Sequence, residues 1–324
     1  MMTVIGYIFF TFFTVAEPGL VGALILSIGA VIMVLSMGSW QALTQVRNVI
    51  IGILAVIVLC GLMTLGGVDF RWVHAITGGV TGAIFVGLVI ERFTIRPLIG
   101  QPIFAVVMVT LAVGLIIRGL TKLIWGTQPQ SLPIFSEPHP WIPGELVRIG
   151  QPITLATKEA FGADILIDQP RLFAFLIALA SFALFWLFLR FTNVGLAMRA
   201  SSENQPLAES VGIRVRMILA ITWGIAAVLA GIAGVLYVGS TDSNAIDPLL
   251  EYVALRAFPA VLLGGLESIG GALIGGLIIG LTEEWAKLLF SGDVAENLAP
   301  FLVLMIILVL KPEGLFGEKR IDRI

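Results

Sequence analysis

The chain has 324 residues, of which 58% are hydrophobic and only 12% are charged, and its formal net charge is −2. Soluble domains carry about 25% charged and about 45–50% apolar residues. The composition, with a mean hydropathy of +1.03, therefore indicates an integral membrane protein, and the net charge leaves no basic surplus for binding nucleic acid. A single cysteine, Cys60, excludes a disulfide framework and a cluster of thiolate metal ligands.

Apolar segments follow one another along most of the chain. A membrane-spanning helix needs about 20 mostly apolar residues, with a range of about 17–25. The clear candidates for such spans are 18–38, 49–66, 72–91, 103–125, 172–189 and 217–239. Shorter apolar runs lie at 4–16, 253–264, 269–286 and 298–311.

The shorter runs decide how many complete spans are expected. Segment 4–16 could insert only partly, and "GGLESIGG" separates 253–264 from 269–286, so these two are expected to form half-helices or a tight hairpin. We therefore predict an all-α integral membrane protein, a polytopic helical bundle of about 8–10 spans with short broken helices. Residues 1–324 are expected to form a single transmembrane domain.

The distribution of Lys and Arg predicts which loops face the cytoplasm. These residues concentrate in 92–102, 190–216 and 311–324, whereas 240–252 has none. Because cytoplasmic loops carry the excess of Lys and Arg, we expect 190–216 to be a cytoplasmic loop and both termini to be cytoplasmic. The long loop 126–171 is then extracytoplasmic, and its many prolines exclude a long continuous helix there. The start of the chain lacks the positively charged region of a cleavable signal peptide.

One compact polar stretch, "RFTNVGLAMRASSENQPLAESVGIRVRM", interrupts the apolar segments at residues 190–217. Its six charged side chains would each cost about 2.5–3.5 kcal/mol at the centre of an inserted helix, so the stretch is expected to stay outside the membrane. Two interpretations are open. One is a loop that only fixes the membrane topology, and the other is an element on which a cytoplasmic partner docks.

Local signals predict a short helix inside this stretch, over about 206–211. Ser202 and Gln205 match a capping box, and Pro206 suits the first turn of a helix. Gly212 stands where a left-handed C-terminal cap would end the helix. The expected helix has a small apolar face, made of Leu207, Ala208 and Val211. A loop that only sets topology has no use for such a helix, which favours the docking interpretation.

The sequence lacks the residue patterns of a catalytic centre. The phosphate-binding pattern G-x-x-x-x-G-K-[ST] is absent, so any ATP that drives this protein would be bound and hydrolysed by another chain. The two histidines, His74 and His139, have no companions at metal-ligand spacing. We therefore expect a protein that is not an enzyme, with no catalytic residue, no bound metal and no cofactor of its own.

Four stretches, in one order along the chain, resemble the permease subunits of the branched-chain amino-acid (LIV-type) ABC transporters. They are "ERFTIRPLIGQP" (91–102), "GLAMRASSENQPLAESVGI" (195–213), "ALRAFPAVLLGGLESIGGALIGGLIIGLTE" (254–283) and "LVLKPEGLFGEKR" (308–320). The Asn-Phe-Ala-His-Gly-like stretch that is usual near the start of this family does not occur in residues 1–80.

The resemblance implies an ABC importer permease that forms the translocation path and couples to separate ATPase subunits. The implied partners are two cytoplasmic ATPase subunits, a second permease subunit and an extracytoplasmic solute-binding protein. The implied location is the cytoplasmic (inner) membrane of a bacterium or archaeon. In this family the loop that matches 195–213 touches the ATPase. The residues at matching positions are Arg199, Ala200, Glu203, Leu207, Ala208, Gly212 and Ile213.

A glycine-rich series and one intramembrane arginine are candidates for the translocation path. Small residues let membrane helices approach closely, so helix packing is the alternative interpretation of the glycines. An intramembrane charge is a functional candidate, although this arginine could also extend to the membrane surface. The residues are Arg256, Gly264, Gly265, Gly270, Gly271, Gly275 and Gly276.

Other functions remain open at this point. An ion-coupled secondary transporter would be expected to show paired intramembrane acids or inverted repeats. A membrane-embedded enzyme would need convergent acid, base or metal-binding residues, and the sequence shows none of these features clearly. Importers of urea, amides or sugars in the same ABC class share parts of the four stretches.

Overall fold

The computed structural model describes residues 1–14, 19–65, 70–132, 134, 153–155, 165–241, 245–247, 250–289 and 293–317. The chain divides into two compact units, Met1–Pro248 (unit 1) and Leu249–Ile324 (unit 2). Within the described residues, six helices are long and apolar enough to cross a membrane. The chain is therefore a multi-pass helical membrane protein, as the composition predicts, while the single domain over 1–324 stays a prediction.

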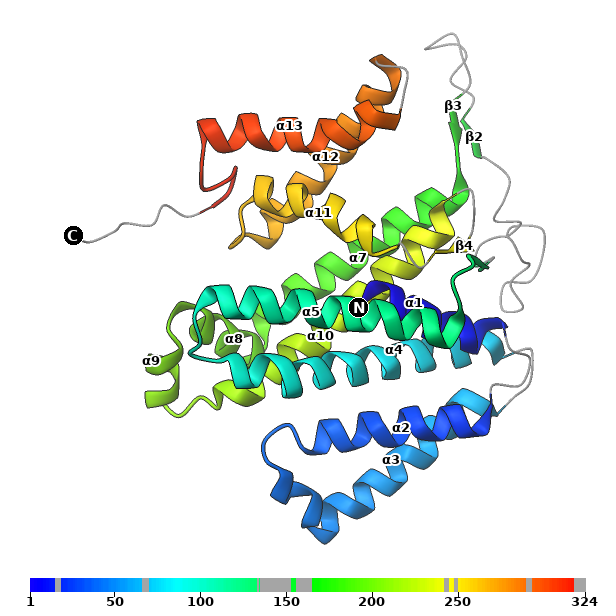
Figure 1. Cartoon of the computed structure of the whole chain (residues 1–324), viewed down its shortest axis with the longest axis vertical. Coiled ribbons are helices and arrows are strands. Elements are labelled where there is room, and N and C mark those ends of the chain that lie inside the picture. The colour runs from blue at the N-terminus through cyan, green and yellow to red at the C-terminus, as the bar shows by residue number, and fades with distance from the viewer. Residues whose placement is uncertain are drawn as a thin grey trace. The chain divides into compact units, whose positions relative to one another are not determined.

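The elements of each unit are labelled in Figure 1. Unit 1 contains α1 (Met2–Thr14), α2 (Leu20–Leu35), η1 (Trp40–Thr44), α3 (Val46–Thr64), α4 (Arg71–Ile90), η3 (Glu91–Ile95), η4 (Arg96–Leu98), α5 (Ile103–Trp125), β1 (Gln130–Ser131), β2 (Ile153–Leu155), β3 (Ile165–Ile167), α7 (Gln169–Phe191), α8 (Asn193–Glu203), α9 (Gln205–Ser210), α10 (Val215–Ser240) and β4 (Ala245–Ile246). Unit 2 contains α11 (Glu251–Gly264), α12 (Ile269–Leu289) and α13 (Asp293–Leu310). Every apolar segment predicted from the sequence forms one of these helices.

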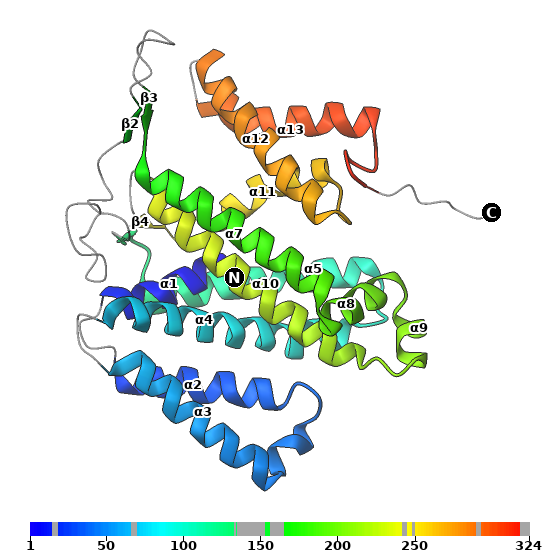
Figure 2. The same ribbon diagram turned by 180° about the vertical axis from the view of Figure 1, so that it is seen from behind.

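Helix α1 forms the centre of unit 1, packed against α4 and α10 (Figure 2). Its 13 residues extend about 20 Å, which is shorter than the ~30 Å hydrocarbon core of a membrane. Glycines on its neighbours make the close packing possible. A Cβ atom on Gly82 would lie 2.9 Å from the Ile8 side chain, and one on Gly231 would collide with Ile5. The segment expected to insert only partly is therefore a buried core helix.

Polar contacts fasten α1 to α5 and to a short strand pair. Strand β1 pairs antiparallel with β4, with Gln130 opposite Ile246. The Tyr7 hydroxyl donates a hydrogen bond to the Ile246 carbonyl oxygen (3.1 Å), and the Trp125 indole N–H donates to the Thr11 hydroxyl (2.8 Å). Most of the long loop 126–171 lies outside the described residues. Its described part contains β1 and the antiparallel pair β2–β3.

The first residues of the chain lie beside α10, near the middle of unit 1 (Figure 1). A Cβ atom on Gly234 would come within 3.0 Å of the Met2 carbonyl oxygen. This end of α1 is distant from α8 and α9 along the bundle, and residues 318–324 at the other terminus lie outside the described part. The side of the membrane to which either terminus faces stays a prediction.

Side chains of η3 and η4, which directly follow α4, hold the turn that follows α2. Carbonyl groups at a helix C-terminus lack partners within the helix. Arg92 donates a hydrogen bond to the Ser36 carbonyl oxygen (3.0 Å), and Arg96 donates to that of Met37 (3.2 Å). Arg96 also makes two hydrogen bonds to the Glu91 carboxylate, at 3.0 and 3.1 Å, and Glu91 is 1% exposed. The stretch "ERFTIRPLIGQP" thus fastens α2 to α4.

Unit 2 is a hairpin of α11 and α12 packed with α13, as the interruption "GGLESIGG" predicts. The chain after α13 returns to cap the end of α11. The Leu315 N–H donates to the Leu263 carbonyl oxygen (2.8 Å), and the Phe316 N–H donates to that of Gly264 (3.0 Å). Gly314 has a φ of 79°, in the left-handed region. The stretch "LVLKPEGLFGEKR" therefore supplies partners for carbonyl groups that α11 leaves unpaired.

Candidate functional site

The polar stretch between α7 and α10 folds into two helices, of which the sequence predicted one. Thr192 ends α7 and begins α8: its hydroxyl donates to the Phe188 carbonyl oxygen (2.7 Å) and accepts from the Gly195 N–H (3.0 Å). A Cβ atom at Gly195 would lie 2.5 Å from the Leu189 carbonyl oxygen, so only glycine permits this sharp turn. Helix α8 packs against both α7 and α10.

The second helix, α9, begins at a different cap from the predicted one. The Asn204 side chain accepts a hydrogen bond from the Leu207 N–H (3.0 Å) and is the N-cap of α9. Ser202 lies inside α8, where its hydroxyl donates to the Arg199 carbonyl oxygen (2.8 Å). The prediction that Ser202 and Gln205 form a capping box at the start of this helix is therefore wrong. It failed because the unpredicted α8 already includes Ser202, and because Asn caps as well as Ser.

The end of α9 matches the sequence prediction. Gly212 has a φ of 88°. Its N–H donates to the Glu209 carbonyl oxygen (3.0 Å), and the Ile213 N–H donates to that of Ala208 (3.0 Å). These two bonds form a Schellman motif, which requires a left-handed residue at the position of Gly212. The chain then turns into α10 within two residues.

Capping by Asn204 can be tested by amide exchange. Replacing Asn204 by alanine should cost about 1 kcal/mol of local stability and raise exchange of the Leu207 amide about fivefold. Hydrogen–deuterium exchange of a peptide covering α9 measures this rate in the purified chain. Ser202→Ala is the matched control and should leave the rate unchanged. If Ser202→Ala raises the exchange rate of the Leu207 amide and Asn204→Ala does not, the predicted capping box is supported instead.

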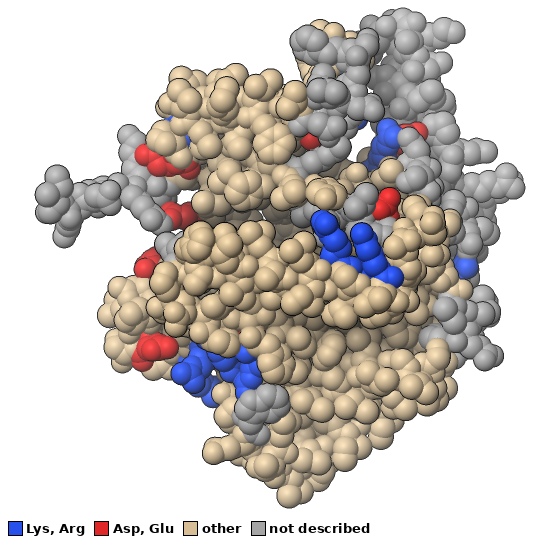
Figure 3. All heavy atoms as spheres, viewed as in Figure 1, with Lys and Arg blue, Asp and Glu red and all other residues tan. Residues whose placement is uncertain are grey.

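Both helices together present a mixed surface, which we call the docking surface. Its apolar members are exposed, with Leu196 59%, Leu207 62% and Val211 72% accessible to solvent. Arg199 and Glu203 are also exposed and flank them on α8. Apolar side chains bordered by charges are typical of protein–protein interfaces. Figure 3 shows charged side chains of both signs at this end of unit 1, beside long helices with few charges.

The structure separates the seven predicted coupling residues into three groups. Arg199, Glu203 and Leu207 belong to the docking surface. Ala208 is 3% exposed and faces the protein, where it holds α9 in place, and Gly212 shapes the turn. The two remaining residues, Ala200 and Ile213, are half-buried. Leu196 was missed, although its spacing of three and seven from Arg199 and Glu203 is that of one helix face.

The predicted path glycines fall on two sides of the α11–α12 hairpin. Cβ atoms on Gly264 and Gly271 would each collide with the carbonyl group of the other, and one on Gly275 would collide with that of Ala260. For these, the packing interpretation is confirmed. Gly270 and Gly276 have open space beside them, so their place on a path stays a prediction.

Two further positions complete the predicted path set. Gly265 ends α11 with a φ of 102° and lies against the backbone of Gly317. Arg256 lies in α11, and its side chain is outside the described part of the chain.

The described residues show no grouping suited to metal binding: no three His, Cys, Asp or Glu side chains converge there. His74 is 1% exposed and its Nε2 lies 2.8 Å from the Leu65 carbonyl oxygen, which is a structural contact between α3 and α4. His139 falls outside the described residues.

Known proteins match most of the chain. Residues 62–310 match a family described as "Branched-chain amino acid transport system / permease component". The high-affinity branched-chain amino acid transport system permease protein LivH of Salmonella typhimurium is 27% identical over 272 residues, which is 82% of each chain. The corresponding permease protein BraD of Pseudomonas aeruginosa is 25% identical over 83% of this chain and 82% of its own.

A sugar permease matches a smaller part. The galactofuranose transporter permease protein YtfT of Escherichia coli is 30% identical over 146 residues, which is 42% of this chain and 41% of its own. No solved structure is significantly similar to this chain.

Proposed function

The chain belongs to the branched-chain amino acid transport permease family, and on that premise we propose that it imports branched-chain amino acids as the membrane subunit of an ABC transporter. Its relatives of this description match over more than four fifths of the chain. The similar sugar permease matches over less than half. The extent of the match therefore favours amino acids over sugars as the transported solute.

The observation that carries the coupling part of the proposal is the docking surface on α8 and α9. Each of the two helices begins at a side-chain cap, α8 packs against both α7 and α10, and α9 packs against α10. Both of these anchoring helices are candidate membrane spans. A partner that moves the docking surface therefore moves two spans with it.

We place two ATPase subunits against this surface, on the cytoplasmic side of a bacterial or archaeal cytoplasmic membrane. ATP binds to those subunits, and their closure displaces α8 and α9. The displacement shifts α7 and α10 and opens the path alternately to each side, provided that the surface is held differently in the two states. A second permease subunit completes the path, and an extracytoplasmic solute-binding protein delivers the amino acid. The permease itself catalyses no reaction.

Leu207→Asp combined with Val211→Asp is expected to abolish coupling. Each substitution places a carboxylate at the apolar centre of the docking surface. Loss of a hot-spot residue at the centre of an interface costs about 2 kcal/mol or more, which is roughly thirtyfold in affinity. The assembled transporter in vesicles should lose ATP-dependent leucine uptake, and the ATPase subunits should no longer co-purify with the permease.

Asn193→Asp combined with Gln205→Glu is the control, because it adds the same two negative charges at exposed helix starts. This variant should assemble and transport normally. Normal uptake by the Leu207/Val211 variant would show that the docking role is wrong. If the wild-type transporter takes up a sugar and no leucine, the proposed solute class is wrong instead.

A further inference from the structure

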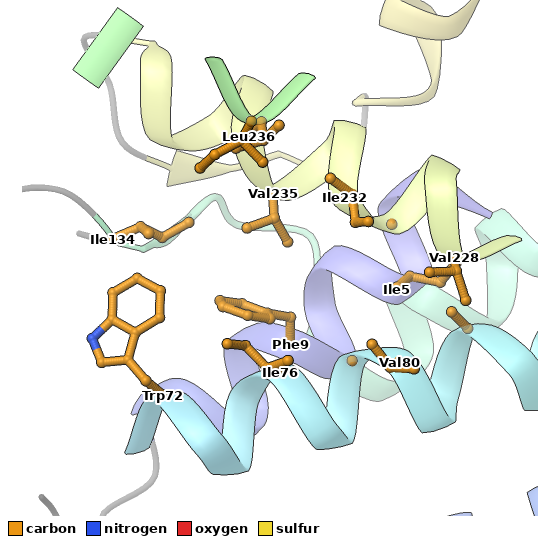
Figure 4. A pocket seen from close by; sticks show the side chains of 14 residues that line it. Ile5, Phe9, Trp72, Ile76, Val80, Ile134, Val228, Ile232, Val235 and Leu236 are labelled. Carbon is orange, nitrogen blue, oxygen red and sulfur yellow. The ribbon is translucent and has the colours of Figure 1, made fainter. Parts of the chain in front are cut away.

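A pocket of about 280 Å³, open on one side, lies within unit 1 between α1, α4, α7 and α10, and Ile134 also lines it (Figure 4). Its lining consists of hydrophobic residues and glycines, with no charged side chain and no hydroxyl group. Engineered apolar cavities of about 150 Å³ stay dry and bind small apolar molecules. We call this larger cavity the slot, and its lining predicts an apolar occupant.

The slot runs parallel to the helix axes. On α4 it extends from Trp72 to Ala83, a rise of about 16 Å, and on α10 from Val228 to Leu236, about 12 Å. Figure 4 shows the side chains of α4 and α10 pointing toward each other across it, with Phe9 of α1 between them. A long, narrow space of this kind fits an extended hydrocarbon chain better than a compact side chain.

The transported amino acid does not suit the slot. A zwitterion brings an ammonium group and a carboxylate, and burying either without a partner carries a large desolvation cost. No lining side chain is ionisable or carries a hydroxyl group, and backbone groups in the interior of a helix bond to one another within it. The slot is therefore separate from the path of a zwitterionic solute.

The slot opens sideways, between α4 and α7. Its exposed lining residues are Ile76 (53% accessible) and Val80 (38%) on α4, and Ile177 (41%) on α7. Both helices are candidate membrane spans, so the opening between them lies at the depth of the hydrocarbon core. A lipid acyl chain can enter without crossing a polar surface.

The residue before Trp72, which lines the slot at its end on α4, is a cation, Arg71. The Arg71 guanidinium lies 5.3 Å from the centre of the Phe13 ring, and Phe13 packs edge-on against Trp72, which lines the slot, at 5.1 Å. Arginine binds phosphate groups well. We propose that the slot holds one acyl chain of a membrane phospholipid whose phosphate is bound by Arg71.

Photolabelling of the full-length chain in phospholipid vesicles tests this proposal. The probe is a phospholipid with a photoreactive diazirine halfway along one acyl chain. Mass spectrometry should find label on peptides that contain 72–83 and 228–236. Val80→Trp fills the slot and should lower this labelling about fivefold, because the added ring takes the space of the chain. Val235→Trp fills it from α10 and should have the same effect.

Val107→Trp is the matched control. It adds the same ring at an exposed valine of α5 (45% accessible) that does not line the slot, and labelling should be unchanged. Equal labelling of the Val80→Trp and Val107→Trp variants would overturn the proposal, as would displacement of the label by excess leucine.

Fluorescence gives a second measurement. Phospholipids with brominated acyl chains should quench the tryptophan emission of the wild-type chain more than that of the Trp72→Phe variant.

The phosphate contact has its own test. Arg71→Gln should lower labelling by the phospholipid probe about threefold and leave labelling by a diazirine-bearing diacylglycerol, which has no phosphate, unchanged. If the substitution changes both probes equally or neither, Arg71 does not bind the phosphate.

Discussion

Replacing Arg96 by alanine is expected to lower the free energy of unfolding by about 3–5 kcal/mol. The Glu91 carboxylate is 1% exposed and receives two hydrogen bonds from Arg96. Without the guanidinium, a buried negative charge has lost its principal partner. The Met37 carbonyl oxygen also loses the hydrogen bond that ties α2 to α4. The melting temperature in detergent and the amount of protein in the membrane should both fall.

Two further variants test whether the loss of stability comes from leaving a buried charge without its partner. Glu91→Leu combined with Arg96→Met removes both charges at similar volume and should recover most of the loss, because apolar replacement of a buried pair is often neutral. Arg171→Ala breaks the pair with Asp168, in which both side chains are about half exposed, and should change stability by less than about 1 kcal/mol. A loss with Arg171→Ala as large as that with Arg96→Ala would contradict this account.

Gly271→Ala is expected to separate the α11–α12 hairpin and to destabilise unit 2 by about 1–3 kcal/mol. The new methyl group would collide with the Gly264 carbonyl group, which is backbone and cannot turn aside. Gly275→Ala should act in the same way against the Ala260 carbonyl group. Protease sensitivity and thermal unfolding of the full-length chain measure the effect.

Gly270→Ala and Gly276→Ala are matched controls, since each is adjacent to a sensitive glycine and has open space beside it. Both should be neutral or stabilising by up to about 1 kcal/mol, because alanine favours the helix. Equal destabilisation at all four positions would refute close packing as the reason for these glycines. If Gly270→Ala or Gly276→Ala blocks transport without loss of stability, that position lines the path.

Local properties of the sequence determined the membrane helices and the hairpin. Length and hydropathy are set by neighbouring residues, so the spans at 103–125 and 217–239 were predicted within two residues at each end. The break at "GGLESIGG" and the left-handed Gly212 are likewise local, because glycine has access to conformations that other residues avoid. The end of α9 could therefore be predicted without knowledge of the fold.

The start of α9 and the composition of the docking surface depended on tertiary structure. Asn204 and Ser202 are both good caps, and the presence of α8 decided between them. Leu207 and Ala208 are adjacent in sequence, yet Leu207 is 62% exposed and Ala208 is 3% exposed, because α8 and α10 cover only one side of α9.

Contacts between distant residues were beyond the reach of sequence patterns. Arg96 reaches back 59 residues to the Met37 carbonyl, and Tyr7 reaches forward 239 residues to that of Ile246. The slot likewise exists only where α1, α4, α7 and α10 meet. The sequence alone determined which segments enter the membrane and which one remains polar, since these depend on the transfer of each segment from water to lipid. Tertiary structure alone decided which side chains meet, because partners far apart in the chain are brought together by packing.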